Sequence, residues 1–338
     1  MRSVWIPRIG PPEVLEVREV PDPHAGPGEV RVRVRASGVN FADCMARMGL
    51  YPDAPKLPCV VGYEVAGTID EVGAGVEDVA AGTAVLTPTR FNGYAELVVV
   101  PAAQIVPLPE GMTFEQGAAL PVNYLTAILM LEMLAQVRAG ERVLIHGAAG
   151  GVGLAAVQLC LLHGAEVIGT ASASKHAALR EAGVAHVIDY RTGDVESEVR
   201  RLTGGRGVDV VLDAIGGEHL RQSYRVLAPL GRLVAFGFSA AAPGTSRRVL
   251  TALWQLARMP RFSPVTLMND NRAVMGVNLG HLWEETALLR TQLATLVDYY
   301  RAGKIRPTVG RTFPLVEAAA AHAYIQGRQN VGKVVLTT

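Results

Sequence analysis

The chain has almost no net charge and few cysteines. Its 338 residues include 32 basic and 31 acidic side chains, which leave a net charge of +1. No overall electric field therefore draws the molecule toward nucleic acid. The three cysteines, Cys44, Cys59 and Cys160, contain no close pair and are too few for a four-cysteine zinc site. These absences favour a small-molecule partner and a reducing compartment.

A long apolar run is also missing. The N-terminal stretch MRSVWIPRIGPPEVLEV lacks the apolar core of a signal peptide. The most apolar segment, YLTAILMLEMLA (124–135), is too short to span a bilayer and contains Glu132. We expect a cytoplasmic protein with no stable membrane insertion.

Two kinds of pattern divide the chain. Residues 1–121 hold short runs rich in Val, Gly and Pro, and the alternation in EVRVRVRASGV has the period of a half-buried strand. This region predicts a mostly β domain of barrel type. From about residue 124, strand candidates alternate with helix-like segments, which predicts a doubly wound parallel sheet. The tail from residue 286 reads as helix, strand, helix, strand, and we expect GKVVLTT to return to the first domain. The predicted domains are 1–121 plus 286–338, and 122–285.

The strongest motif is VLIHGAAGGVGLAAVQL, in which a buried strand runs into a glycine-rich turn and then a helix. Glycine allows the tight turn and lets the backbone approach a pyrophosphate, which the amides at the helix start then bind. The residues expected at the phosphates are Gly150, Gly151, Val152 and Gly153. The alternative is a loop that needs glycine only for its backbone angles.

The next strand ends in GTASASKH, where a site specific for NAD would place an acidic residue. Ser172 and Lys175 stand there, and a hydroxyl with an ammonium suits a 2′-phosphate. Tyr190, after the third strand, adds a further donor, whereas Asp189 is the nearest acid that argues the other way. The sequence favours NADPH over NADH. The alternative is that Lys175 only opens a solvated helix face.

Several segments together resemble the medium-chain dehydrogenase/reductase superfamily and, within it, the zinc-free quinone-oxidoreductase branch. They are GVNFADCMARMGLYPDAPKLPCVVGYEVAGTIDEVGAGV, AALPVNYLTAI, GAAGGVGLAAVQL and NVGKVVL, in the same order over essentially the whole chain. VNYLTA, GTASASKH and NRAVMGVNLG are most similar to the group around the vesicle amine transport protein homologue. The resemblance implies an α/β fold in which a GroES-like β-rich domain is interrupted by a Rossmann domain.

The resemblance also implies that no metal is bound. Zinc-dependent relatives hold their catalytic zinc with cysteine and histidine at positions where this chain has Asn40, Tyr63 and Asn123. LTPTRFNGYAELVV passes through the region of the structural zinc lobe without a cysteine. We interpret Cys44 and Cys59 as small core residues. A metal-dependent dehydrogenase with unusual ligands is the competing hypothesis, and metal analysis would decide it.

Without a Lewis acid, the expected reaction is hydride delivery from NADPH to a quinone or to a C=C bond conjugated to a carbonyl. Tyr51 is the first catalytic candidate, because relatives have a tyrosine there that is thought to supply a proton. The alternative is a tyrosine of the substrate wall, with solvent as the proton source. Asn40 either donates to the substrate oxygen or holds the loop that carries Asp43, which we interpret as structural. For Tyr63 we favour packing.

Family position implies further cofactor contacts. Thr126 is expected near the nicotinamide and Ile215 beside the adenosine. The remaining expected contacts are Phe236, Gly237, Val277, Leu279, Asn330 and Lys333.

The acceptor is left open. Arginines 247, 248, 258 and 261 surround an apolar helix-like segment. This basic face would suit the phosphates of an enoyl-CoA thioester, or it is a solvated or dimer-flanking helix. A hypothesis of another class is an NADPH-binding protein without significant turnover, since relatives serve as lens crystallins or associate with vesicles. We also expect a homodimer, with the strand candidate RAVMGVNL at the contact.

Overall fold

Strand β3 (Glu29–Val39) organises the N-terminal part of the chain. Its valines point inward and are buried, while Arg31 and Arg33 point outward and pair with Asp70 of the next strand. This is the alternation that the sequence predicts for a half-buried strand. β3 pairs with three neighbours, β4, β6 and β15, all of them antiparallel.

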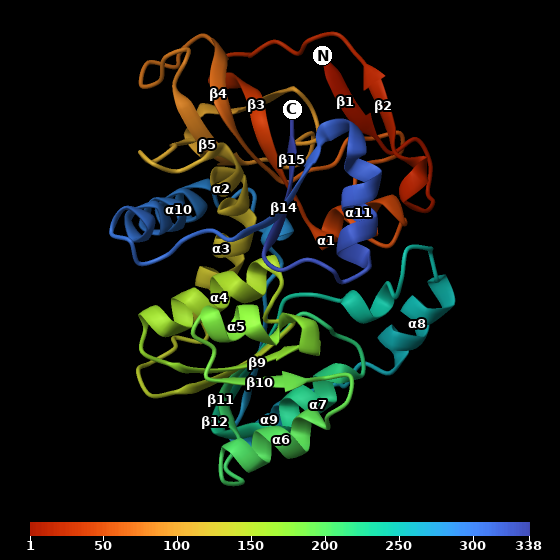
Figure 1. The fold of residues 1–338 in the computed structure, drawn as a ribbon, viewed down its shortest axis with the longest axis vertical. Coiled ribbons are helices and arrows are strands. Elements are labelled where there is room, and N and C mark those ends of the chain that lie inside the picture. The colour runs from red at the N-terminus through yellow and green to blue at the C-terminus, as the bar shows by residue number, and fades with distance from the viewer. The chain divides into compact units, whose positions relative to one another are not determined.

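The computed structural model describes residues 1–338, which form two compact units (Figure 1). The β unit consists of Met1–Leu125, Gly244–Arg247 and Leu279–Thr338, and the Rossmann unit of Thr126–Pro243 and Arg248–Asn278. The domain boundaries expected from the sequence are 121/122 and 285/286. In the structure, the chain passes between the units after Leu125 and after Asn278. The chain therefore leaves the β unit, builds the Rossmann unit and returns.

The β unit contains a seven-stranded sheet in the order β14-β15-β3-β4-β5-β7, with β6 paired to β3, and a two-stranded ribbon β1-β2. GKVVLTT forms β15 beside β3, as the tail predicts. The strands are β1 (Arg2–Trp5), β2 (Glu16–Glu19), β3, β4 (Glu64–Val72), β5 (Ala84–Pro88), β6 (Leu97–Pro101), β7 (Val106–Pro107), β14 (Val309–Pro314) and β15 (Lys333–Thr337). The helices are η1 (Pro12–Val14), α1 (Phe41–Arg47), η2 (Ala102–Gln104), α2 (Phe114–Ala119), η6 (Leu279–His281), α10 (Thr286–Arg301), η7 (Leu315–Glu317) and α11 (Ala318–Gln326); α3 (Pro121–Ile128) runs from this unit into the other.

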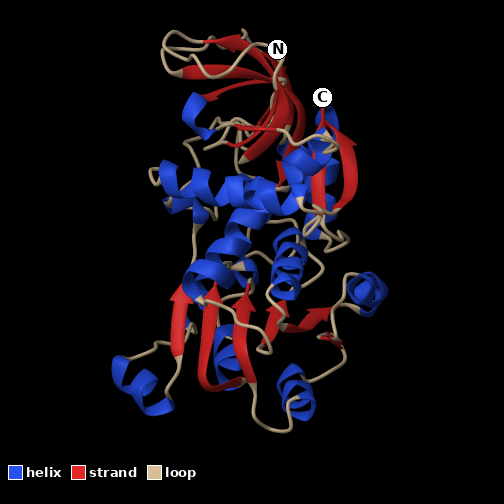
Figure 2. Cartoon of the chain, turned by 90° about the vertical axis from the view of Figure 1, so that its left-hand side faces the viewer, coloured by secondary structure: helices blue, strands red, loops and turns tan.

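The Rossmann unit is a six-stranded parallel sheet in the order β10-β9-β8-β11-β12-β13. Figure 2 shows its strands side by side with helices around them. The strands are β8 (Arg142–His146), β9 (Glu166–Ala171), β10 (His186–Asp189), β11 (Val208–Asp213), β12 (Leu227–Ala235) and β13 (Ala273–Gly276). The helices are η3 (Leu129–Leu134), α4 (Gly151–Leu162), η4 (Ala173–Lys175), α5 (His176–Glu181), α6 (Val195–Leu202), α7 (His219–Arg225), η5 (Ser239–Ala241), α8 (Val249–Ala257) and α9 (Pro264–Asp270).

Both units have their own apolar core. One cluster in the Rossmann unit joins β8, β9 and β11 to α6 and α7, and separate clusters fill the β unit. The α/β class predicted from the sequence is confirmed. None of the helices combines the length and the apolar character required to cross a lipid bilayer.

Candidate active site

The glycine-rich turn lies between β8 and α4 in the Rossmann unit. Gly147 has a φ of 67°, in the left-handed region that glycine tolerates. A Cβ atom added to Gly153 would lie 2.5 Å from the carbonyl oxygen of Gly147 and 2.6 Å from that of Ala148. No side chain caps the start of α4, and its first turn has no acidic residue. The turn therefore fits a pyrophosphate bound by the first amides of α4.

The residues predicted to select NADPH gather at the ends of β9 and β10. Ser172 follows β9 and is 6% exposed, with its hydroxyl 3.3 Å from that of Ser174. Lys175 closes the short helix η4, three residues further on. Tyr190 follows β10 and is 36% exposed. Asp189, the contrary acid, accepts a hydrogen bond from the Arg191 backbone N–H at 2.9 Å. The carboxylate is thus used within its own turn.

A polar network closes the carboxyl end of β11 in the same unit. Asp213 accepts hydrogen bonds from the backbone N–H groups of Ile215 (2.7 Å) and Gly216 (2.9 Å) with one oxygen. Its other oxygen lies 2.6 Å from Ser223 Oγ and 2.9 Å from His219 Nδ1. Burial raises the pKa of this carboxyl, but its hydrogen bonds with His219 and Ser223 and its electrostatic interactions with His146 and His219 together outweigh burial and lower the pKa overall. Asp213 therefore fixes the turn that carries Ile215, a residue expected beside the adenosine.

The β unit contains a buried ion pair that joins the ends of three strands. The Lys333 ammonium pairs with the Glu64 carboxylate, and both side chains are at most 2% exposed. The ammonium also donates to Asn40 Oδ1 at 2.6 Å and lies 3.5 Å from Asn123 Oδ1. Asn40 Nδ2 and the Val122 backbone N–H donate to Glu64 at 3.1 and 2.7 Å. This cluster holds together residues 40, 64, 123 and 333, which are distant in the sequence.

A second buried network lies around α1 of the β unit. Asp43 accepts from the backbone N–H groups of Asn40 and Gly62 and from the Tyr94 hydroxyl. The prediction that Asp43 is a structural acceptor is confirmed. Burial raises its pKa to about 7. Tyr94 Oη also lies 3.2 Å from His322 Nε2, and the Arg47 guanidinium lies 3.4 Å from His322 Nδ1.

The hydrogen bonds of this network all run in one direction, from Arg47 toward Asp43. Arginine can only donate, so Arg47 donates to His322 Nδ1, and the imidazole proton sits on Nε2 and is donated to Tyr94. The tyrosine then donates to Asp43. Burial, with the nearby charge of Arg47, lowers the pKa of His322 to about 3, which keeps the ring neutral. Arg47 and Gln326 also bind the carbonyl groups of Thr245 and Gly244, so the network holds that segment.

Three aromatic rings form a wall in the β unit. Tyr63 is 5% exposed, its ring meets Tyr51 edge-on with centroids 6.2 Å apart, and it lies 5.2 Å from Phe91. The predicted packing role of the Tyr63 ring is confirmed. Its hydroxyl, however, is buried without a hydrogen-bond partner. Burial raises the pKa of Tyr51 and of Tyr63, so both phenols stay protonated at neutral pH. Tyr51 and Tyr63 are thus two O–H donors on one wall.

The other residues expected at the cofactor are distributed over both units. The Asn330 side chain donates to the Gly332 carbonyl, and Leu279 is buried in η6. Thr126 is buried in α3, and the Phe236 and Val277 amides bind the carbonyl groups of Asp213 and Ala235. Residues in the Rossmann unit are Thr126, Ile215, Phe236, Gly237 and Val277; those in the β unit are Leu279, Asn330 and Lys333.

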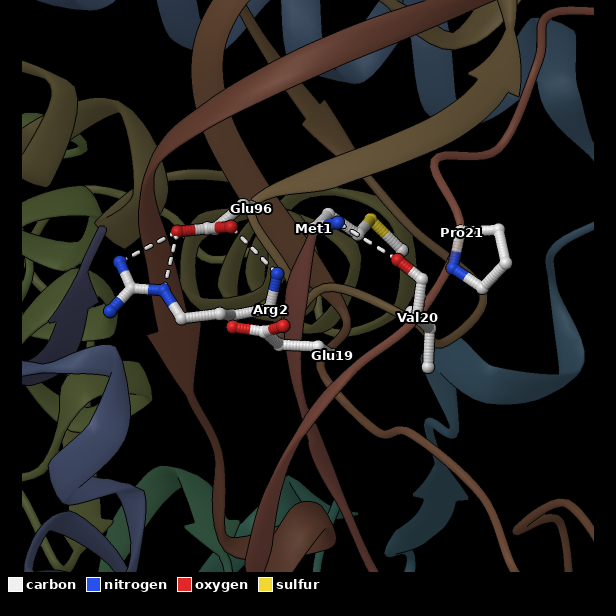
Figure 3. Close-up of a pocket in the computed structure, with 6 residues that line it drawn as sticks. All are labelled: Met1, Arg2, Glu19, Val20, Pro21 and Glu96. Atoms are coloured by element: carbon white, nitrogen blue, oxygen red, sulfur yellow. Dashed lines mark hydrogen bonds and ion pairs between the residues drawn. The ribbon is translucent and has the colours of Figure 1, made fainter.

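A surface pocket of the β unit plays no part in this site (Figure 3). It is lined by Met1, Arg2, Glu19, Val20, Pro21 and Glu96. Two of its charged groups, Arg2 and Glu96, are joined in an ion pair at 2.6 Å. The Met1 nitrogen donates to the Val20 carbonyl at 2.8 Å. We assign this pocket no chemical role.

Sequence reasoning missed Glu64, Asp213 and the unpartnered hydroxyl of Tyr63. Glu64 had a signal, since it is an acid inside the otherwise apolar stretch VVGYEVAG. Such an acid needs a cation when buried. Asp213 also had a signal, because it ends a buried strand at the edge where parallel sheets bind ligands. Nothing in the sequence distinguishes the Tyr63 hydroxyl from that of any other tyrosine.

Comparison with known families matches both parts of the chain. Residues 26–110 match the family described as "Alcohol dehydrogenase GroES-like domain", and residues 182–336 the family described as "Zinc-binding dehydrogenase". The human "Synaptic vesicle membrane protein VAT-1 homolog" is 42% identical over 323 residues, which cover 95% of this chain and 82% of the human protein. The zebrafish (Danio rerio) protein of the same name is also 42% identical, but this chain spans 64% of its length.

Solved structures give the same grouping. Escherichia coli quinone oxidoreductase, solved with NADPH, superposes with a TM-score of 0.88 and 29% identity over the whole of both chains. A mycobacterial protein complexed with NADPH gives a TM-score of 0.88 and 32% identity, again over both whole chains. The CurK enoyl reductase gives 0.86 and 31%, with 99% of this chain and 98% of that chain covered.

The zinc in one family description can be tested against the residues present. Asn40, Tyr63 and Asn123 offer no thiolate or imidazole, and a lysine ammonium lies against both asparagines. Cys44 and Cys59 are buried, free thiols whose pKa values burial raises, as expected of core residues. His146, Asp213 and His219 do converge within 4.8 Å, but both oxygens of Asp213 already accept hydrogen bonds. The residues at the positions of the family's catalytic ligands therefore do not fit zinc.

Proposed function

Because the chain belongs to the zinc-free, quinone-oxidoreductase-like branch of the medium-chain dehydrogenase/reductase superfamily, near the VAT-1 proteins, we propose that it reduces electrophilic acceptors with NADPH. The acceptor class is a quinone or a C=C bond conjugated to a carbonyl, in an enone or an enoyl-CoA thioester. The reaction uses no metal. The observation that carries the proposal is the pair of protonated phenols, Tyr51 and Tyr63, in a unit that has Asn40, Tyr63 and Asn123 at the positions of the zinc ligands of zinc-dependent relatives.

NADPH is the cofactor, and its nicotinamide supplies hydride when it is bound. The first amides of α4, at Gly151 to Gly153, bind the pyrophosphate, and Ser172 and Lys175 bind the 2′-phosphate. The Asp213 network holds the Ile215 turn beside them. We assign the remaining cofactor contacts to Thr126, Gly150, Val152, Tyr190, Phe236, Gly237, Val277, Leu279, Asn330 and Lys333.

Reduction of a conjugated acceptor leaves negative charge on its oxygen, which needs a donor. Tyr51 is half-buried and Tyr63 has an unused O–H group, so either can donate a hydrogen bond or a proton to that oxygen. We assign proton donation to Tyr51, with the Tyr63 hydroxyl as a second donor. Asn40 takes a positioning role through Lys333 and Glu64, because its carbonyl oxygen and its amide are used in that cluster.

Two narrower alternatives remain to be separated. A preference for enoyl-CoA would assign the CoA phosphates to arginines 247, 248, 258 and 261, and one solved relative with this fold is an enoyl reductase. An NADPH-binding protein without turnover would agree with relatives named for vesicle membranes. The two neighbouring phenols on one wall favour an enzyme, since they can donate to the oxygen of a bound acceptor.

The test is NADPH oxidation with a panel of acceptors that includes a quinone, a short enone, and straight and branched enoyl-CoA esters. We expect turnover by metal-free protein and a loss of kcat of about 100-fold in Tyr51→Phe, with unchanged NADPH affinity. The matched control is Tyr324→Phe, whose hydroxyl is bonded to the Gln329 carbonyl at an exposed site.

Three outcomes would contradict the proposal. Absence of turnover with every acceptor would support the binding-protein alternative. One zinc ion per chain, with activity lost on chelation, would restore the metal-dependent hypothesis. Full activity in the double variant Tyr51→Phe/Tyr63→Phe would mean that solvent supplies the proton.

A further inference from the structure

A strained turn lies beside the aromatic wall of the β unit. Phe91 has a φ of 130° and Asn92 a φ of 64°, both in the region that favours glycine. Asparagine tolerates this region, but a bulky residue such as phenylalanine is an outlier there, and the surrounding structure has to enforce it. Strain of this kind is concentrated at sites that bind ligands.

Backbone contacts on both sides of Phe91 hold the turn in this conformation. Before it, the Thr89 N–H donates to the Tyr63 carbonyl at 2.8 Å; after it, the Gly93 N–H donates to the Gly62 carbonyl at 3.2 Å. A Cβ atom added to Gly62 would lie 2.8 Å from Gly93 Cα, so the two backbone segments are in close contact. The turn therefore cannot relax without separating from the segment that carries Tyr63.

The turn places the Phe91 ring against Tyr63. The two ring centroids are 5.2 Å apart with the planes tilted by 56°, and Tyr63 also meets Tyr51 edge-on. Tyr63 is buried, whereas Phe91 and Tyr51 are half-buried. Burial of the Phe91 ring thus returns less than at a core position, and glycine would adopt the same backbone angles without strain. The chain therefore keeps a strained phenylalanine at a wall position that is still partly open.

The wall combines apolar ring faces with protonated hydroxyls. Aromatic rings at these distances gain from edge-on and offset-stacked contacts. A flat conjugated ring that carries a carbonyl group can contact the Phe91 ring while its oxygen accepts from the O–H of Tyr51 or Tyr63. A straight-chain enone or enoyl thioester offers the same oxygen but no ring. Phe91 therefore distinguishes acceptors that the two phenols alone would treat alike.

We propose that Phe91, held by its strained turn, is a specificity-determining residue that selects acceptors with a flat conjugated ring over straight-chain acceptors. The inference rests on the proposed function, in which Tyr51 and Tyr63 donate to the oxygen of the acceptor. Within that function it names the preferred class of substrate. It leaves the binding of NADPH unchanged.

Direct binding tests the role of Phe91 independently of turnover. With the intact protein saturated with NADP⁺, calorimetric titration gives the affinity for naphthoquinone, a flat ring acceptor, and for a straight-chain octenone. Phe91→Leu should weaken naphthoquinone binding at least about tenfold and octenone binding less than about twofold, because only the ring contact is lost. Phe91→Tyr keeps an aromatic ring and should bind both acceptors like the parent protein.

Phe262→Leu is the matched control. Phe262 is also half-buried and packs against Tyr224 in the Rossmann unit, with ring centroids 4.9 Å apart. This variant should bind both acceptors like the parent protein. In turnover assays, Phe91→Leu should lower the ratio of kcat/KM for naphthoquinone to kcat/KM for octenone at least about tenfold, with an unchanged KM for NADPH.

A second pair of variants tests the strain in the turn. Phe91→Ala and Phe91→Gly both remove the ring, but only glycine adopts a φ of 130° freely. Phe91→Gly should therefore unfold at a higher urea concentration than Phe91→Ala, which reverses the order found at a position with ordinary backbone angles.

The proposal is overturned if the parent protein binds naphthoquinone no better than octenone, or if Phe91→Leu binds both like the parent. Equal weakening of the two acceptors would make Phe91 a general packing residue, and a higher stability of Phe91→Ala than of Phe91→Gly would remove the strain from the argument. A parent protein that binds naphthoquinone through Phe91 but turns over no acceptor would contradict the proposed reductase activity and support the role of Phe91.

Discussion

Lys333 carries a buried ammonium that contacts Asn40, Glu64 and Asn123. Two of these residues, Asn40 and Asn123, stand where family resemblance places ligands of the catalytic zinc in zinc-dependent relatives. The Lys333 side chain is only 2% exposed. Its partner Glu64 is equally buried, so the two charges compensate each other.

Breaking this ion pair should be costly, and removing it completely should cost less. Lys333→Met leaves the Glu64 carboxylate buried without its cation, which should lower the free energy of unfolding by about 3–5 kcal/mol. Lys333→Met/Glu64→Gln removes both charges and should recover part of that loss, as urea unfolding can measure. If the double variant is no more stable than Lys333→Met, the pair does not act as a compensated unit.

Neutral His322 should make the protein sensitive to acid. Its pKa is about 3 when folded, against 6.5 for an ordinary histidine, so the unfolded chain takes up the proton first as pH falls below 6.5. Stability from this group is full above pH 6.5 and declines toward pH 3. The advantage of the parent protein over His322→Gln should shrink by about 2 kcal/mol between pH 6.5 and 5.

Urea unfolding at the two pH values checks this, with the exposed His24→Gln as the control. His146, also buried with a pKa of about 3, contributes with the same sign. Asp43 contributes with the opposite sign, because a pKa raised to about 7 adds stability as pH falls. Both groups are present in each protein compared. A constant difference between parent and variant would show that His322 does not titrate in this way.

Lys175 should determine the choice between NADPH and NADH. Lys175→Ala removes a charged contact to the 2′-phosphate and should weaken NADPH binding by roughly 1–3 kcal/mol, with little effect on NADH. Fluorescence titration with both nucleotides measures the two affinities. Equal weakening of the two would remove Lys175 from the phosphate site.

At the scale of elements, the connection between β8 and α4 is the part of the site that depends on backbone geometry. The atoms that a side chain at Gly153 would meet are carbonyl oxygens, which cannot rotate away. A conformational change of the whole turn would be needed to accommodate it.

Gly153→Ala should therefore weaken NADPH binding at least about tenfold while the fold is retained. Gly276→Ala is the matched control, because its added Cβ would lie 3.7 Å from the nearest atom, an ordinary contact. Calorimetric titration with NADPH compares the two. Unchanged affinity in Gly153→Ala would mean that the turn does not cradle the pyrophosphate.

Elements whose signals are local were predictable from the sequence, and clusters assembled over long separations were not. The glycine turn and the ends of β9 and β10 are each encoded by one short sequence segment. Their positions in the fold therefore follow from the order of strands and helices. The Lys333–Glu64 pair joins positions 269 residues apart, and no periodicity encodes such a contact. The sequence predicted a basic, apolar helix near residues 247–261. The contact that anchors this helix to the Rossmann unit depends on Glu218, which lies outside that segment.

For the molecule as a whole, β13 is an edge strand of the six-stranded sheet with β12 as its one partner. An open strand edge can pair with the same edge of a second copy across a two-fold axis. We keep the expectation of a homodimer and assign the contact to this edge.

Light scattering should give twice the chain mass of 35.9 kDa. Met275→Lys would place two like charges face to face across the axis and should yield monomers. A parent protein that is monomeric at micromolar concentration would contradict the assignment.

The pairing of β15 with β3 affects the order in which the parts of the chain can fold. β15 pairs residue by residue with β3, with Val334 opposite Val39 and Leu336 opposite Ser37. On the ribosome, β3 is made before β15, and all strands of the Rossmann sheet lie between them in the sequence, so the β3–β15 pairing forms only after those strands have been made. All strands of the Rossmann sheet are synthesised in between and can assemble first. Glu64 has no partner cation until Lys333 has been made, so we expect the region around this ion pair to close after the Rossmann strands have been synthesised.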